Sequence, residues 1–281
     1  MTALVGCDFS SSPSPRKPIV LAWGECVDST VRLRRLERLD SLAHFSDWLH
    51  APGSWIGGFD LPFGLPRELV EILGWPTDWE ACIRHYASLS RPNIRTQFAA
   101  FCDARPVGGK FAHRATDYPA GSSPSMKWIN PPVALMLHAG VPLLLEAGIC
   151  LPGLYPGNPL HVDALGVPLH VALEAYPGLL AREILGRRTY KSDDKAKQTS
   201  ERLIARKDVV TALELGKTRL GLRLKLTHAQ RDALVADASG DTLDATLCML
   251  QAAWASQQPG GQPGFGLPPQ MDPLEGWIIT A

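Results

Sequence analysis

The sequence lacks the short motifs by which many metal, redox and nucleotide sites are found. Its six cysteines lie far apart and form no CxxC pair, which argues against a zinc knuckle or a dithiol redox site. Its eight histidines show no HxxxH spacing, which argues against a zinc hydrolase of that type. Neither a GxxxxGK(S/T) loop nor a GxSxG elbow occurs, so P-loop and α/β-hydrolase chemistry are not indicated.

Long apolar segments are missing as well. The longest, from Pro131 to Leu145, contains His138, Gly140 and Pro142 and is too short to span a bilayer. After Met1 the chain enters a short strand without the pattern of a signal peptide. We therefore expect a cytoplasmic protein with reduced thiols and no membrane contact.

Neither positive nor negative charge dominates, but the charged residues are unevenly distributed along the chain. The 281 residues carry a formal net charge of +0, which argues against a broad surface that coats nucleic acid. Residues 182–231 hold fourteen Lys or Arg against six Asp or Glu, whereas residues 232–281 hold none against six. A basic segment followed by an acidic one suits a site that binds phosphate near metal; a solvated basic helix face fits the same pattern.

What is present is an α/β pattern. The first three strands follow each other closely and predict an antiparallel meander, with a shift in the alternation of the third that indicates a β-bulge. Five strands are predicted in all: Ala3–Cys7, Ile19–Val27, Thr30–Leu39, Trp55–Asp60 and His170–Tyr176. Helices are predicted from Ser41 to about His50 and at roughly 178–185, 195–215, 227–238 and 241–255.

The region from roughly residue 67 to 160 interrupts this pattern. It is rich in proline, glycine and short helical pieces, so we expect a mainly helical and loop insertion after the fourth strand, covering the sheet or its active end. Its middle, residues 84–127, holds seven Lys or Arg against Asp103 and Asp117. We expect one domain over residues 1–281 that includes this insertion.

Five acidic residues occupy positions typical of a site. Asp8 ends the first strand, Asp60 ends the fourth, and Glu174 lies in the apolar run of the last strand. Asp241 and Asp244 lie in the first turn of the final helix, three residues apart and so on one face. If the first, fourth and last strands are adjacent and parallel, Asp8, Asp60 and Glu174 converge beyond their carboxyl ends.

Carboxylates that lie this close together are expected to bind a cation. Like charges packed together raise each other's pKa unless something neutralises them, and hard divalent ions with oxygen ligands do so. Two such ions about 3.5–4 Å apart promote phosphodiester hydrolysis. We expect Mg²⁺ or Mn²⁺ held by Asp8, Asp60, Asp241 and Asp244, with Glu174 assisting catalysis.

Each acid also has a structural alternative. Asp8 and Asp60 precede turn-forming residues and could stabilise turns. Asp241 and Asp244 could cap the helix and complement its dipole. Glu174, buried in a strand, needs a partner, which an arginine could supply.

Two basic residues are candidates for substrate binding. Lys191, after Tyr190 in a basic turn, could contact a scissile phosphate as a point charge, or be a solvated loop lysine. Arg114 with Asp117 could clamp a phosphate, or form a local ion pair.

Several short motifs in order along the chain resemble those of a known family. They are Val5-Gly6-Cys7-Asp8, Gly58 to Pro66 (GFDLPFGLP), Leu173-Glu174-Ala175-Tyr176-Pro177, Tyr190-Lys191, Asp241-Thr242-Leu243-Asp244-Ala245 and Glu275-Gly276-Trp277-Ile278. With them the chain resembles a domain-of-unknown-function family of ribonuclease-H-like proteins, thought to be nucleases, from bacteria and archaea. The resemblance implies a ribonuclease-H-like mixed sheet with an inserted region and a metal-dependent nuclease activity.

The acidic layout is also similar to that of Holliday-junction resolvases in the same superfamily. Those carry one acid on the first strand, one on the fourth and an Asp-x-x-Asp pair on the last helix, a pattern that Asp8, Asp60, Asp241 and Asp244 match. Glu174 departs from that pattern, so the resemblance does not assign it as a ligand, a base or a structural partner.

The leading hypothesis from the sequence is a divalent-metal phosphodiesterase that acts on DNA or RNA. A catalytically silent module that binds nucleic acid or a nucleotide is the alternative if the acids are caps and turn residues. A phosphotransferase of the actin or sugar-kinase type shares the sheet but normally has two such domains and glycine-rich phosphate loops, and only one sheet is readable here.

Overall fold

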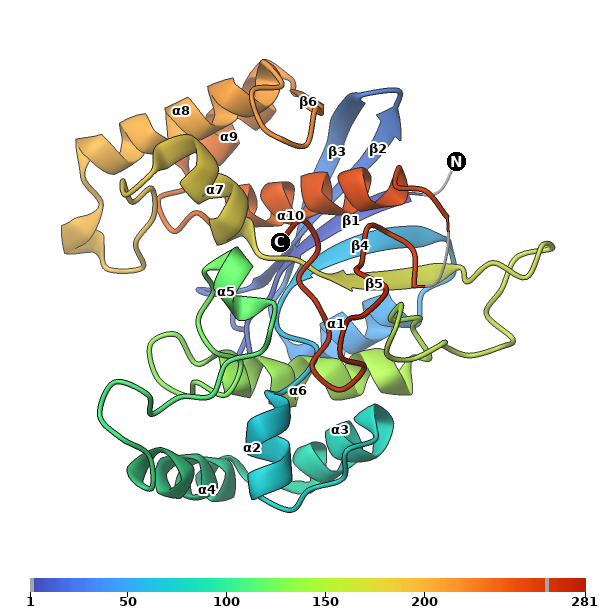
Figure 1. The fold of residues 1–281 in the computed structure, drawn as a ribbon. Helices are drawn as coiled ribbons and strands as arrows, with labels where there is room; N and C mark the ends of the chain where they lie inside the picture. Colours follow the sequence, from blue (N-terminus) through green and yellow to red (C-terminus); the bar gives the residue numbers. More distant parts are fainter. Residues whose placement is uncertain (1–2, 261–262) are drawn as a thin grey trace.

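The computed structural model describes residues 3–260 and 263–281, and in these ranges a mixed six-stranded sheet lies between two layers of helices (Figure 1). The strand order is β5-β4-β1-β2-β3-β6. The α/β class expected from the sequence is therefore confirmed. The strands are β1 (Ala3–Asp8), β2 (Ile19–Val27), β3 (Thr30–Leu39), β4 (Trp55–Asp60), β5 (His170–Glu174) and β6 (Arg223–Lys225).

The first three strands form the expected meander. Strand β2 pairs antiparallel with both β1 and β3, and all other neighbouring strands pair in parallel. The expected bulge is present, because Trp23 faces Arg35 while Gly24 faces Leu33, which leaves Arg34 as the extra residue of β3. Strands β1, β4 and β5 are adjacent and parallel, so their carboxyl ends share one edge.

The number of strands and two predicted element boundaries were wrong. The sheet has six strands, not five, because β6 pairs with β3; only three residues long, with Leu224 alone buried, it has no periodicity to detect. The helix predicted over 195–215 is broken into the short 3₁₀ turn η1 (Lys195–Lys197) and α8 (Ser200–Glu214), with Thr199 extended between them. Strand β5 ends at Glu174 because Pro177 already begins the next helix.

One helical layer contains α1 and the insertion. Side chains of Ser41, Asp78 and Ser90 accept backbone N–H bonds at the starts of α1, α3 and α4, as N-cap residues do. The large hydrophobic core on this side joins the sheet to the insertion. The helices are α1 (Leu42–Leu49), α2 (Arg67–Ile72), α3 (Trp79–Ser88), α4 (Arg91–Asp103), α5 (Asp117–Ala120) and α6 (Val133–Glu146).

The opposite layer contains α7 (Pro177–Leu185), α8, α9 (His228–Ala236) and α10 (Asp241–Ser256). Helix α10 lies directly on β1 and β4, where Gly6 and Gly58 are paired in register. A Cβ at Gly6 would lie 1.9 Å from the backbone oxygen of Ala245, and one at Gly58 would lie 2.4 Å from that of Cys248. Only glycine permits this close approach of helix and sheet.

Within the described ranges, no helix is long and apolar enough to cross a membrane. All six cysteine thiols, which lie in those ranges, are free.

Candidate functional site

The pleat of the sheet turns Asp8 and Asp60 toward α10. These residues end β1 and β4 and are paired in register. Because side chains alternate between the two faces of a strand, Asp8 shares the face of Gly6, and Asp60 shares the face of Gly58. That face is the one on which α10 packs.

Asp244 reaches the same point from the start of α10. Gly240, with φ of +82°, allows the turn into the helix, and a Cβ there would lie 2.7 Å from Cβ of Lys191. The side chain of Asp244 is fully buried. Asp8, Asp60 and Asp244 each offer a carboxylate oxygen, and these oxygens lie within 4.8 Å of one another. These three residues are called the acidic triad below.

The crowding changes the protonation of the triad. Burial, followed by the charge of Asp244, raises the pKa of Asp8 well above its usual range, although the ammonium of Lys191 opposes this. Burial raises the pKa of Asp60 to about 7, again against the effect of Lys191. Both shifts show that a cation at this point would be stabilising, since it would favour the ionised form.

Asp244 already has two partners. The Tyr190 hydroxyl donates to one carboxylate oxygen and the Lys191 ammonium donates to the other. Lys191 is therefore not a fully solvated loop lysine. Burial would lower its pKa, but Asp244 and the other nearby acids outweigh this and raise it well above the usual value. The buried guanidinium of Arg206 holds this loop by donating to the backbone oxygen of Tyr190, at 2.7 Å.

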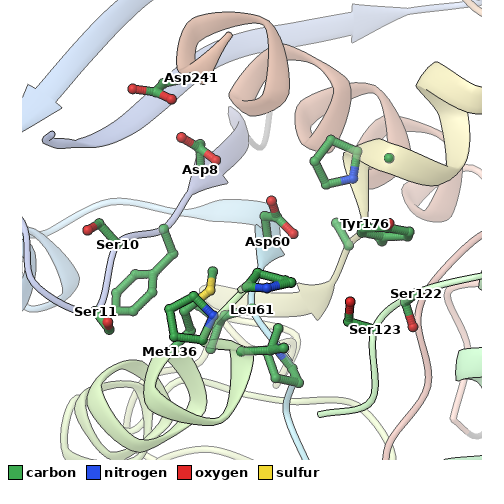
Figure 2. Close-up of a pocket in the computed structure, with 18 of the residues that line it drawn as sticks. Asp8, Ser10, Ser11, Asp60, Leu61, Ser122, Ser123, Met136, Tyr176 and Asp241 are labelled. Carbon is green, nitrogen blue, oxygen red and sulfur yellow. The ribbon is translucent and has the colours of Figure 1, made fainter. Parts of the chain in front are cut away.

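Asp241 lies outside the triad. It lines the same cleft and lies beyond Asp8 in Figure 2, and burial followed by the charge of Asp237 raises its pKa. The capping role that the sequence left open for Asp241 and Asp244 belongs to Asp237, which accepts from the backbone N–H and hydroxyl of Thr242 at 2.9 and 2.7 Å. The sequence analysis did not consider Asp237, which lies five residues before Thr242 and accepts these bonds.

Glu174 does not join the triad, contrary to the convergence expected from its strand. It pairs in register with Phe59, not with Asp60, so its side chain points to the insertion side of the sheet. There its carboxylate accepts two bonds from Arg114, at 2.7 and 2.8 Å, and the backbone N–H of Phe63 at 2.9 Å. The arginine partner that a buried glutamate requires is Arg114.

Arg114 is the centre of a buried polar cluster. Its guanidinium also donates to the Asp117 carboxylate, at 3.0 Å, and to the backbone oxygen of Glu275, at 3.1 Å. Only 2% of its side chain is exposed, and both adjacent carboxylates neutralise its charge. The local ion pair with Asp117 is thus present, and Glu174 extends it into a cluster.

Asp8 and Asp60 of the triad, together with Asp241 and Glu174, line one cleft with a volume of about 580 Å³. Figure 2 shows Asp8, Asp60 and Asp241 on one side, Met136 and Leu61 opposite, and Tyr176 with Ser122 and Ser123 on a third side. Apart from Arg114, the sequence assigned no role to the lining residues from the insertion, nor to Tyr176, because these side chains carry no charge. Lys17, which also lines the cleft, forms an ion pair with Asp193.

The donor set fits a hard divalent ion. All three nearest ligand atoms are carboxylate oxygens, which suit Mg²⁺ or Mn²⁺ better than a thiophilic metal.

Comparison of the chain with family models, with curated proteins and with solved structures found no match.

Proposed function

We propose that this protein is a divalent-metal-dependent phosphodiesterase that acts on nucleic acid. The observation that carries the proposal is the acidic triad, in which oxygens from β1, β4 and α10 lie within 4.8 Å of one another beside a cleft of about 580 Å³. Three carboxylates at such spacing favour binding of a cation, and functional groups at the carboxyl ends of parallel strands face a ligand.

Asp8, Asp60 and Asp244 would hold Mg²⁺ or Mn²⁺. Such an ion supplies a Lewis acid that stabilises the negative charge which develops on a phosphodiester during hydrolysis. Asp241, on the wall of the same cleft, is the further acid that would bind water or an outer ligand. Glu174 acts indirectly, because Arg114 occupies both of its oxygens.

Lys191 supplies a positive charge to the triad in the absence of metal. Its ammonium contacts Asp244, yet 43% of its side chain remains exposed, and the residue lines the cleft. A divalent ion at the triad would repel this ammonium, and the flexible side chain would then be available to a substrate phosphate. This assigns Lys191 to phosphate binding in the loaded site.

The placement of the acids supports a ribonuclease-H-like sheet as part of this proposal. The expected pattern has one acid on the first strand, one on the fourth and a pair on the last helix. Asp8 on β1, Asp60 on β4, and Asp241 and Asp244 on α10 follow it. The silent binding module is the alternative, in which Lys191 and protonation of the acids take the place of a metal ion.

Cleavage of a labelled panel with Mg²⁺ or Mn²⁺ tests the proposal. The panel holds single-stranded, duplex and branched DNA, RNA and an RNA–DNA hybrid. We expect metal-dependent cleavage that Asp8→Asn reduces by roughly 100-fold or more, since even the partners of metal ligands contribute about 10–100-fold.

Asp47→Asn is the matched control, because Asp47 lies on the exposed side of α1 and should leave the rate unchanged. Full activity in Asp8→Asn would contradict the assignment. Absence of cleavage, together with no rise in melting temperature on adding metal, would favour the silent binding module.

A further inference from the structure

The cleft has two chemically different sides. Asp8 and Asp60 of the triad, together with Asp241, line one side, where a metal and a phosphate would sit (Figure 2). The opposite wall is apolar and comes from the ends of β1 and β4 and from the start of α6. Its side chains are Phe9, Leu61, Pro62, Pro131, Pro132, Val133 and Met136.

The residues that line the cleft do not form a row of cations that could bind a second phosphate. Within the described ranges the cleft has three cationic lining residues, and each is already paired. Lys17 contacts Asp193, Lys191 contacts Asp244, and Arg114 contacts Glu174 and Asp117. A groove for a continuous backbone needs several cations, because duplex DNA carries one charge per roughly 1.7 Å of helix axis. The apolar wall lacks them.

Tyr176 closes the third side with a fixed aromatic ring. Its backbone N–H donates to Gln251 at 3.2 Å, and the Arg182 guanidinium lies 5.6 Å from the ring centre. A Cβ at Gly178 would lie 2.7 Å from the ring, so the glycine leaves room for it. In Figure 2 the ring lies beside Ser123, on the side of Asp60 away from Asp8. Aromatic rings at such sites stack on nucleobases.

We propose that this cleft binds one unpaired nucleotide unit, with its phosphate at the acidic triad and its base between Tyr176 and the wall around Met136. The volume of about 580 Å³ suits a ligand of that size, within the range of roughly 300–1,000 Å³ of small-ligand pockets. The substrate is therefore a single strand or a small nucleotide ester, and not the backbone of an intact duplex. This inference rests on the proposed function only where it places the phosphate at the triad; the site for the base does not depend on it.

Binding measured by calorimetry in Mg²⁺ tests the base site without requiring cleavage. Thymidine 5′-phosphate is compared with deoxyribose 5-phosphate, which has no base. We expect the base-free ligand to bind about fivefold or more weakly, the least that stacking of one base contributes. Tyr176→Ala should bind both ligands equally, whereas Tyr176→Phe should retain the preference.

Tyr118→Ala is the matched control, because Tyr118 is 72% exposed on α5 and does not line the cleft. Met136→Lys provides a second variant if Tyr176→Ala does not fold, and it should also remove the preference for the base. Equal binding of the two ligands by the unchanged protein, or no binding of either, would overturn the proposal. So would a preference that persists in both Tyr176→Ala and Met136→Lys.

Cleavage separates this inference from the proposed function. Single-stranded oligonucleotides should be cut and a blunt duplex of the same sequence should resist. Cleavage of the duplex at the same rate would overturn the nucleotide-unit proposal and leave the metal-dependent phosphodiesterase intact. Base-dependent binding without cleavage of any substrate would support the nucleotide site and refute the phosphodiesterase.

Discussion

At the scale of single residues, the three acids of the triad repel one another, and the positive charge of Lys191 offsets only part of this repulsion. Asp8, Asp60 and Asp244 contribute three acids, and the Lys191 ammonium contacts Asp244 directly and acts on Asp8 and Asp60 through its charge. Burial removes the water that would otherwise screen these charges. In the metal-free protein the balance is met in part by protonation, as the raised pKa values of Asp8 and Asp60 indicate.

This predicts a pH dependence of stability in the metal-free protein. Folding raises the pKa of Asp60 from 3.8 to about 7, so the folded state binds this proton more tightly than the unfolded state. The contribution to the free energy of unfolding is complete below the unfolded pKa and is lost as pH rises through about 7. Asp60→Asn should flatten this decline, measured by denaturant unfolding between these pH values.

Mg²⁺ should act in the opposite direction, because it binds the ionised carboxylates. We expect it to stabilise the protein more above pH 7 than below the unfolded pKa of 3.8. Asp47→Asn should retain the pH dependence of the unchanged protein. An Asp60→Asn protein with an unaltered decline would show that other groups cause it.

At the scale of elements, the contact of α10 with β1 and β4 builds the triad. Gly6 and Gly58 let the helix backbone approach the strands, and the next residues of the same face are Asp8 and Asp60. The separation of helix and sheet therefore decides whether Asp244 reaches the strand ends.

Gly6→Ala should disrupt this contact. Its Cβ would lie 1.9 Å from the Ala245 oxygen and 2.3 Å from the Met249 nitrogen, so α10 must move outward. We expect a destabilisation of about 1–3 kcal/mol or more, as for an overpacked core, together with loss of the metal-induced rise in melting temperature.

Gly109→Ala makes the same chemical change in open space, where the nearest atoms lie 3.9 Å from the added Cβ. It should leave both quantities unchanged. A Gly6→Ala protein with normal stability and a normal response to metal would show that α10 does not need this approach.

At the scale of the whole molecule, the Arg114 cluster joins segments that are distant in sequence. It ties the insertion to β5 through Glu174, and to the C-terminal segment through the backbone oxygen of Glu275. The Glu275 carboxylate adds bonds to the backbone N–H groups of Arg67 and Ala115, at 2.8 and 2.9 Å. The cluster therefore holds this part of the insertion against β5 and the C-terminal segment.

Arg114→Met should therefore be strongly destabilising. It would leave the buried carboxylates of Asp117 and Glu174 without their cation, and breaking a buried pair costs about 3–5 kcal/mol. Arg84→Met, which removes an exposed pair with Glu80, should cost roughly 0.5 kcal/mol or less. Equal losses in the two variants, measured by denaturant unfolding, would refute the structural role of Arg114.

The sequence by itself determined the α/β class, the meander with its bulge, and the positions of Asp8, Asp60 and Asp244 at element ends. These features depend on local periodicity, turn residues and helix starts, which neighbouring residues specify. The short strand β6 was missed because three residues, with Leu224 alone between two basic ones, carry no periodic signal.

Only the tertiary structure decided which of these groups meet. Glu174 and Asp60 both end parallel strands, but a register offset of one residue sends their side chains to opposite faces. Lys191 meets Asp244, and Arg114 meets Glu174, across 53 and 60 residues of chain. Such pairings depend on strand register and on how closely α10 packs, which are set by contacts between distant segments and leave no pattern in a local stretch of sequence.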